Sequence, residues 1–159
     1  MLRQFAIAGY LAAFLTSAEG AEFRIQGDAP YCDAVVVHGP NPRGASASAH
    51  TGRSIILIDP SVLDKLPYVR GFVLAHECGH HALGHTSPQG FLLEGFLFQD
   101  KELAADCWAA QTLSKAGQGT IVEQQIALFE ARKDRRPGPR YPAWRKRVEK
   151  IRECLKSAS

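Results

Sequence analysis

The sequence lacks a strong excess of charge of either sign. Its formal net charge is +3, and 45% of its residues are apolar while 22% are charged. This composition is ordinary for a globular domain and excludes disordered, collagen-like and coiled-coil classes. A phosphate-binding surface usually has a much larger basic excess, so we expect no nucleic-acid partner. Internal repeats are absent too, and 159 residues suffice for one domain with one core but not for two.

The sequence also lacks an apolar run long enough to cross a bilayer. An uncharged apolar segment from Phe5 to Leu15 follows Arg3 and precedes small residues at positions 17, 18, 20 and 21. This segment is too short for a membrane span, and the order is that of a secretory signal. We therefore predict a signal peptide at residues 1–21, a single domain at 22–159, and a secreted or periplasmic protein without a transmembrane span after signal removal.

No two cysteines are close in sequence, which disfavours a cysteine zinc cluster. The four are Cys32, Cys78, Cys107 and Cys154. An even number in an exported chain suggests two disulfides, for which three pairings exist.

The remaining sequence predicts an α+β fold, with a short antiparallel or mixed sheet packed on a mainly helical body. Residues 34–38 and 54–58 are rich in β-branched residues, as is typical of strands, whereas 43–52 are small and polar and predict a loop. Asp100 is expected to cap a helix, and Gly84 and Gly117 to end helices. The predicted helices cover residues 60–66, 69–83, 100–115, 120–132 and 143–155.

The strongest motif is His76-Glu77-Cys78-Gly79-His80. Histidines four residues apart on a helix project from one face, so both can bind one metal ion. Glu77 points elsewhere but stays close enough to take a proton from a metal-bound water. The apolar run before His76 indicates a buried helix rather than a surface helix with chance histidines.

A catalytic zinc site needs a third protein ligand and one open position. Glu102 and Asp106 are four residues apart and share a helix face. We predict Glu102 as the third ligand and Asp106 as the acceptor of a hydrogen bond from a ligand histidine. Ala104 and Ala105 are expected to let the two helices approach closely.

This combination, His76-Glu77-x-x-His80 followed by Glu102-x-x-Ala-Asp106, resembles the gluzincin clan of zinc metallopeptidases. The spacing is similar to that of thermolysin-like enzymes and the small minigluzincins, and the motif also resembles CAAX-type prenyl endopeptidases, which are multi-span membrane proteins. The resemblance covers residues 55–113. It implies a zincin-like fold, Zn²⁺ as cofactor, Glu77 as base, Glu102 as ligand and Asp106 as an orienting residue. It also implies a substrate along an edge strand, for which Ser54–Ile58 is the candidate.

Other ligand sets fit less well. A metzincin would need glycine and histidine where this chain has Leu83 and Thr86. His81 and His85 are four apart, but His81 is turned about 100° from His80, and we expect hydrogen bonds or a polar surface for both. On the predicted helices the cysteines at 78 and 107 point away from the metal, which favours disulfides; we prefer the pairs Cys32–Cys78 and Cys107–Cys154.

The predicted function is that of an exported zinc metallopeptidase that hydrolyses peptides or proteins with zinc-activated water and Glu77 as general base. The alternative is a non-catalytic zincin-fold module for binding or assembly in the cell envelope. The residue that stabilises the oxyanion is left open among Tyr68, His85, Arg140 and Tyr141. An apolar cluster is predicted to be core rather than substrate pocket: Phe91, Leu92, Phe96, Leu97 and Phe98. A cationic run is predicted to be a solvated face: Arg132, Lys133, Arg135, Arg136 and Arg140.

Overall fold

The computed structural model describes residues 22–50, 52–87 and 94–157, in which four strands and five α-helices form an α+β fold. The predicted signal peptide at 1–21 lies outside the described residues, as do Phe91 and Leu92 and the side chain of Phe96. No helix in the described ranges has the length and apolar character needed to cross a membrane.

The strands form one mixed sheet in the order β1-β2-β4-β3. The outer pairs, β1 with β2 and β3 with β4, are antiparallel, and β2 runs parallel to β4. This confirms a small mixed sheet. The strands are β1 (Arg24–Asp28), β2 (Val35–His38), β3 (Ala45–His50) and β4 (Arg53–Ile58).

β3 corrects the predicted loop at 43–52. Its sequence ASASAH has little intrinsic strand preference, but its backbone pairs with β4 from Ala45 opposite Ile58 to His50 opposite Arg53. Pairing with a neighbouring strand determines whether a segment of low strand propensity becomes a strand, because strand formation depends more on that pairing than on intrinsic propensity. Ser54–Ile58 is also not an edge strand as predicted. It lies within β4, between β2 and β3, so β3 and β1 are the edges of the sheet.

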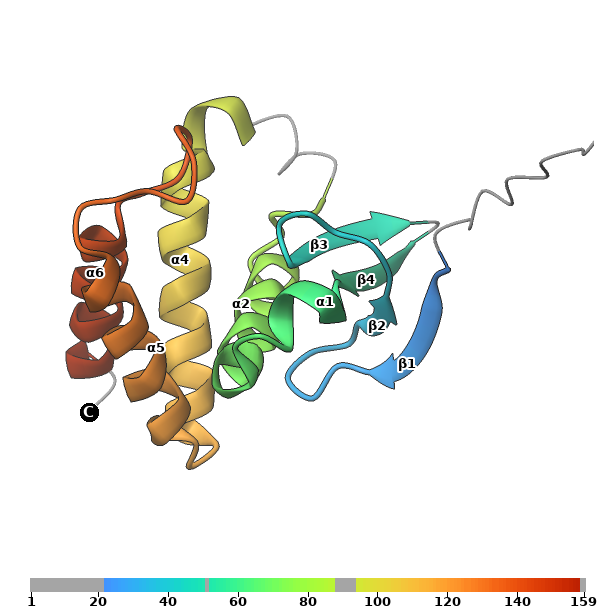
Figure 1. Ribbon diagram of the computed structural model, residues 1–159, viewed down its shortest axis with the longest axis horizontal. Coiled ribbons are helices and arrows are strands. Elements are labelled where there is room, and N and C mark those ends of the chain that lie inside the picture. Colours follow the sequence, from blue (N-terminus) through green and yellow to red (C-terminus); the bar gives the residue numbers. More distant parts are fainter. Residues whose placement is uncertain (1–21, 51, 88–93, 158–159) are drawn as a thin grey trace, which may run out of the picture.

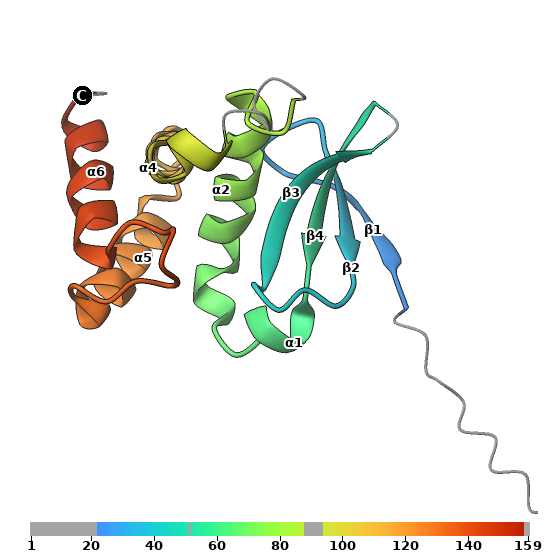
Figure 2. The same ribbon diagram turned by 90° about the horizontal axis from the view of Figure 1, so that it is seen from above.

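The helices follow the sheet in the chain and stack beside it in layers. They are α1 (Pro60–Leu63), α2 (Arg70–Ala82), α4 (Glu94–Lys115), α5 (Gly119–Arg132) and α6 (Trp144–Ser157), with a 3₁₀ turn η1 (Pro67–Val69) before α2. Viewed from above, α2 lies between the sheet and α4, and α5 and α6 cover the far side of α4 (Figures 1 and 2). The helix α2 is therefore central to the fold.

Two glycines end helices as predicted. Gly84, after α2, has φ +70°, and Gly117, after α4, has φ +72°. At the first end, His85 N–H donates to His80 C=O and Gly84 N–H donates to His81 C=O. These are the two hydrogen bonds of a Schellman motif, which needs a left-handed residue that glycine supplies without strain.

The predicted cap at Asp100 is wrong. The helix α4 begins earlier, at Glu94, and has a kink at Leu97, where φ is −111° and ψ is 15°. Asp100 therefore lies inside α4, because the chain resumes helical geometry directly after the kink. A capping residue type predicts a helix start only where no helix already precedes it.

Two apolar clusters share α2. On its sheet side, Cys78 packs with β-strand residues such as Ile56 and Ile58. On its other side, Phe72 packs with Leu113 of α4 and with residues of α5 and α6. With both faces covered, α2 is packed between the two clusters, and its motif residues lie at the centre of the fold.

Two disulfides tie these layers together with the preferred pairing. Cys32–Cys78 joins the chain before β2 to α2, and Cys107–Cys154 joins α4 to α6. The two cysteines of the second disulfide are 47 residues apart in the sequence. Both are compatible with the predicted extracytoplasmic location, where disulfides persist.

Candidate metal centre

The site forms where α2 and α4 make their closest approach. Gly79 faces Ala105 so tightly that a Cβ built on Gly79 would lie 3.1 Å from the Ala105 carbonyl oxygen. Ala105 is fully buried at this contact, in agreement with the prediction that it lets the two helices approach closely. Gly79 contributes equally, because any side chain there would push the helices apart. The close contact brings His76 and His80 of α2 up to Glu102 of α4.

These three residues form a group that can hold a metal ion. His76 Nε2 lies 3.2 Å from His80 Nε2 and 3.5 Å from Glu102 Oε2, and His80 Nε2 lies 3.4 Å from Glu102 Oε1. Ligand atoms at about 2.0–2.1 Å from a tetrahedral zinc ion are about 3.3–3.4 Å apart. The His76–His80 distance is close to this value, and each nitrogen lies near a different oxygen of Glu102, so the three side chains converge closely enough to hold one metal ion.

His76 is supported by residues of two other helices. Its Nδ1 lies 2.9 Å from Asp106 Oδ1 of α4. Asp106 in turn accepts two hydrogen bonds of 2.6 Å from Arg147 of α6, one on each carboxylate oxygen. With Nδ1 donating to Asp106, the Nε2 lone pair of His76 faces the metal group. Asp106 is fully buried, and Arg147 is only 7% exposed.

The electrostatics of the site favour a cation between the two carboxylates. Burial disfavours a charge on His76, but its hydrogen bonds to Asp106 and Glu102 outweigh this and raise the pKa of His76 to about 10. Burial likewise opposes ionisation of Glu102, yet His76 and His80 hold its pKa well below the usual range. Both shifts have one cause, the stabilisation of positive charge beside the carboxylates. A metal ion would replace the proton on His76.

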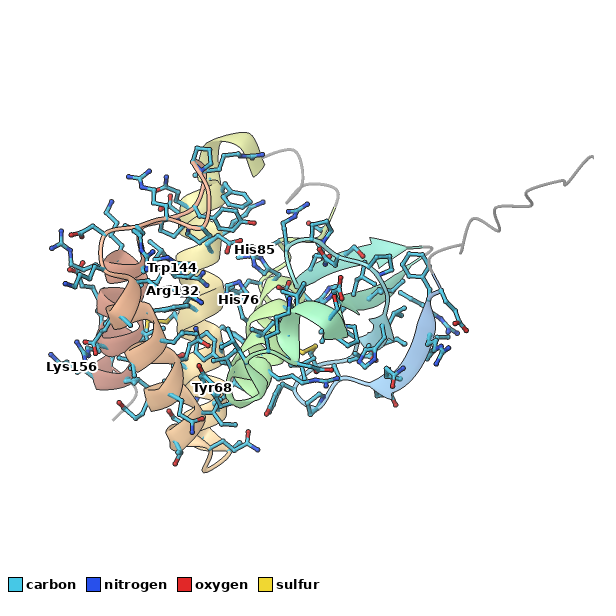
Figure 3. The ribbon with its side chains drawn as sticks, viewed as in Figure 1. Tyr68, His76, His85, Arg132, Trp144 and Lys156 are labelled. Carbon is cyan, nitrogen blue, oxygen red and sulfur yellow. A yellow bond between two sulfur atoms is a disulfide. The ribbon has the colours of Figure 1, made fainter. Side chains whose placement is uncertain are left out.

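His80 is supported locally, by a residue of its own helix end. Its Nδ1 lies 3.0 Å from Nδ1 of His85, which the Schellman turn at Gly84 brings back beside it. If His80 binds a cation through Nε2, its Nδ1–H must donate and His85 must accept. Burial, followed by the nearby His80, lowers the pKa of His85 to about 4, which keeps His85 neutral and able to accept. Figure 3 shows His76 and His85 near the middle of the molecule.

Glu77 is buried, at 8% exposure, yet it lines the cleft together with His76 and His80. Its carboxylate makes no hydrogen bond or ion pair with the described part of the chain. Neither of its oxygens is among the fully buried, unpartnered atoms of the described residues, so the carboxylate is open to the cleft. A molecule in the cleft can therefore contact this carboxylate directly.

The cleft above these residues has a volume of about 1440 Å³. One wall is the edge strand β3, from Ala45 to Ala49, and the opposite wall comes from α5 and the chain leading into α6. The resemblance implied an edge strand beside the site, and the strand with that position is β3 rather than the predicted Ser54–Ile58. Among the described strands, β3 pairs only with β4, so the other edge of its backbone has no neighbouring strand.

Other candidates have different positions. His81 bonds to Thr86 and to the Ile55 carbonyl oxygen, so it joins α2 to the sheet and not to the metal group. Tyr68 is 46% exposed and does not line the cleft, while Tyr141 does and packs edge-on against Phe98 at 4.9 Å. No geometry selects an oxyanion partner.

Two predictions about surface and core are revised. Leu97 is 42% exposed and Phe98 lines the cleft, so neither belongs to the core as expected. The cationic run is exposed as predicted except for Arg132, which is half-buried with its guanidinium 5.0 Å from the Trp144 ring centroid. Leu97 lies at the kink of α4, and Phe98 packs against Tyr141 instead of the apolar clusters.

Arg147 is the site residue that sequence reasoning missed. It lies on the same face of α6 as the buried Val148, Ile151 and Cys154. Its position in an otherwise apolar stripe was the available signal. A charged residue on a buried face is rarely without a partner, so the position indicated a buried ion pair. The partner itself, Asp106, is 41 residues away and could not be identified from α6 alone.

No family model matches this chain, and no curated protein or solved structure matches it either.

Proposed function

We propose that this protein is an exported zinc metallopeptidase of gluzincin type with a zincin-like fold. The observation that supports it is the His76, His80 and Glu102 group, which can hold a metal ion. Glu77 lies beside it and makes no hydrogen bond or ion pair in the described part of the chain. Three protein ligands leave one position open, as in catalytic rather than structural zinc sites. The donor set of two imidazoles and one carboxylate suits zinc.

In this proposal the chain's own residues have separate roles. His76, His80 and Glu102 would hold zinc, which supplies a Lewis acid and a water of lowered pKa. Asp106 holds the tautomer of His76 that presents Nε2. Glu77 takes the proton of the attacking water and passes it to the leaving amine of the peptide bond. The substrate class is a peptide or protein, which the length and openness of the cleft along β3 accommodate.

Replacing Glu77 by glutamine tests the base directly. Glu77→Gln is expected to lower peptide hydrolysis by about 10²–10⁴-fold, because the amide cannot accept the proton. Zinc affinity is expected to stay unchanged, because Glu77 is not a ligand. The measurement is digestion of a peptide library by zinc-loaded protein, with zinc content determined in parallel, and the exposed Glu123→Gln serves as matched control.

Two results would count against the proposal. Cleavage by Glu77→Gln at the wild-type rate would remove Glu77 from the mechanism. Failure of the zinc-loaded wild type to cleave any library peptide would favour the non-catalytic binding module instead.

A further inference from the structure

The charges of the chain are distributed unevenly along the sequence. Residues 132–157 contain 11 of the 19 Lys and Arg residues but only 3 of the 16 Asp and Glu residues. This part therefore has a formal net charge of +8, and the rest of the chain has −5. It comprises the end of α5, the segment that follows and α6, on the side of the molecule away from the sheet (Figures 1 and 2). A positive field on one side of a protein attracts anionic partners.

Some of these cations are balanced within the protein and others are not. Four form ion pairs with described carboxylates: Arg145 with Asp134, Arg147 with Asp106, Lys150 with Glu153 and Arg152 with Glu130. Four others, which we call the basic rim, form no ion pair with any described residue: Arg132, Lys133, Arg135 and Arg136. Arg132 is half-buried and the other three are exposed. The basic rim therefore has charge to offer to a bound anion.

The basic rim borders the cleft. Arg132 lines the cleft, with its guanidinium 5.0 Å from the Trp144 ring centroid, and Pro137, directly after the basic rim, lines it too. The backbone carbonyls of Lys133 and Arg135 accept hydrogen bonds from the N–H groups that begin α6, which ties this segment to the helix. Figure 3 shows Arg132 and Trp144 together on the helical side of His76. A polypeptide that leaves the cleft on this side passes over the basic rim.

The lining of the cleft has the same sign of charge away from the metal group. Among the described residues that line it, the only carboxylates are those of Glu77 and Glu102, which a bound zinc ion would balance. Four basic residues line it as well: Arg43, Lys101, Arg132 and Arg147. Arg147 is balanced by Asp106, but Arg43 precedes β3 on one wall and Arg132 ends α5 on the other. A lysine or arginine side chain would be repelled between these walls, whereas a carboxylate would be attracted.

We infer that the basic rim binds an acidic segment of the polypeptide substrate, whose Asp or Glu side chains pair with it while adjoining residues lie in the cleft. This substrate class rests on the proposed peptidase function. A membrane is a poorer partner, because none of the large apolar side chains exposed in the described structure belongs to residues 132–157. Such side chains are what a surface helix or loop buries among lipids. The continuity of the basic rim with the cleft instead favours a chain that occupies both.

The test measures binding and cleavage separately. Two peptide libraries share a randomised core and carry either a run of glutamates or a run of glutamines, at each end in turn. Zinc-loaded Glu77→Gln protein captures peptides from both libraries, and zinc-loaded wild type digests them. Capture and kcat/KM are expected to be about 3- to 20-fold higher with glutamates at one end, and the difference should fade in high salt. Arg135→Gln/Arg136→Gln should remove most of this preference. The matched control Lys65→Gln/Lys115→Gln removes equal charge at exposed residues that do not line the cleft, and should retain it.

Other results have distinct meanings. Equal cleavage of both libraries would overturn the basic rim and leave the peptidase standing. Preferential capture that Arg135→Gln/Arg136→Gln abolishes, without cleavage by the wild type, would support the basic rim and reject the peptidase. Neither capture nor cleavage would reject both. Equal losses in the rim variant and its control would show an effect of net charge alone and overturn the basic rim.

Vesicles of phosphatidylglycerol and phosphatidylcholine provide the last probe. Binding to these vesicles that Arg135→Gln/Arg136→Gln abolishes, together with no preference between the two libraries, would assign the basic rim to membranes and overturn the inference. Absence of vesicle binding, together with the preference for glutamates, would support it.

Discussion

The two imidazoles of the metal group differ in what holds them. His76 is buried and is held by Asp106 of α4, which is in turn held by Arg147 of α6. Asp106 lies 30 residues after His76 in the sequence, and Arg147 lies 41 residues after Asp106. His80 is half-buried and depends on His85, five residues further along the chain. One ligand is thus oriented by the tertiary structure and the other by a single turn.

This difference separates the consequences of losing each support. The His76 chain contains a buried ion pair, so a break there leaves a charge inside the protein. The His80–His85 contact is a hydrogen bond between two imidazoles and not an ion pair, so a break there removes only an orienting hydrogen bond. We expect the first to change the stability of the fold and the second to change mainly the affinity for metal.

The largest effect is predicted for Asp106. Asp106→Ala leaves the guanidinium of Arg147 buried without its partner, which is expected to lower the free energy of unfolding by about 3–5 kcal/mol. Urea denaturation of the zinc-free protein, with its disulfides intact, measures this. The double variant Asp106→Ala/Arg147→Met should recover most of the loss, because no uncompensated charge remains.

An exposed ion pair provides the control for Asp106. Arg152 and Glu130 are 2.8 Å apart at the surface, and Glu130→Ala is expected to cost at most about 1 kcal/mol. Equal losses in the single and double Asp106 variants would show that the buried charge is not the cause.

The next effect is the dependence of zinc affinity on pH. In the metal-free protein the raised pKa of His76, about 10, keeps a proton on the ring at neutral pH. Zinc must displace this proton, so its affinity should rise with pH, by about tenfold per unit. Competition with a chelator at pH 6, 7 and 8 measures the slope. A slope that levels off above pH 7 would show an ordinary histidine pKa and contradict the shift.

His85 tests the local support. His85→Ala is expected to weaken zinc binding by about tenfold, the lower end for residues that orient a ligand, with little change in the unfolding midpoint. His81→Ala is the matched control at the same helix end. It loses the bond to Ile55 and some stability, but should keep the zinc affinity of the wild type. Unchanged zinc binding in His85→Ala would show that His80 needs no support.

The smallest effect compares two glycines with the same backbone geometry. Gly84 and Gly117 both have positive φ, and a Cβ on either would meet no atom within 4 Å. Alanine at each should therefore cost about 1–2 kcal/mol through backbone strain alone, measured by denaturation. Only Gly84→Ala should also weaken zinc binding, by a few-fold, because Gly84 presents His85. Equal zinc affinities in both variants would show that the turn at Gly84 does not affect the metal site.

Prediction from the sequence succeeded where helical geometry relates nearby residues. The pairs His76 with His80 and Glu102 with Asp106 are four residues apart, and the helix places each pair on one face whatever surrounds it. The same angular argument directed the cysteines at 78 and 107 away from the metal group, in agreement with both disulfides. The coarse α+β class followed from equally local patterns.

Prediction failed where the environment of a residue is formed by residues far away in the sequence. The small, polar residues 45–50 become a strand only because β4 offers its backbone, and this pairing moves Ser54–Ile58 from the sheet edge to its interior. The burial of Arg147 against Asp106 likewise joins separate helices.

The sequence alone therefore determined which side chains can share a face, because a helix repeats every 3.6 residues independently of its neighbours. The tertiary structure decided which faces meet, which strand borders the cleft and which charge balances Asp106. Those features depend on packing between elements far apart in the chain, where no fixed period relates one residue to another.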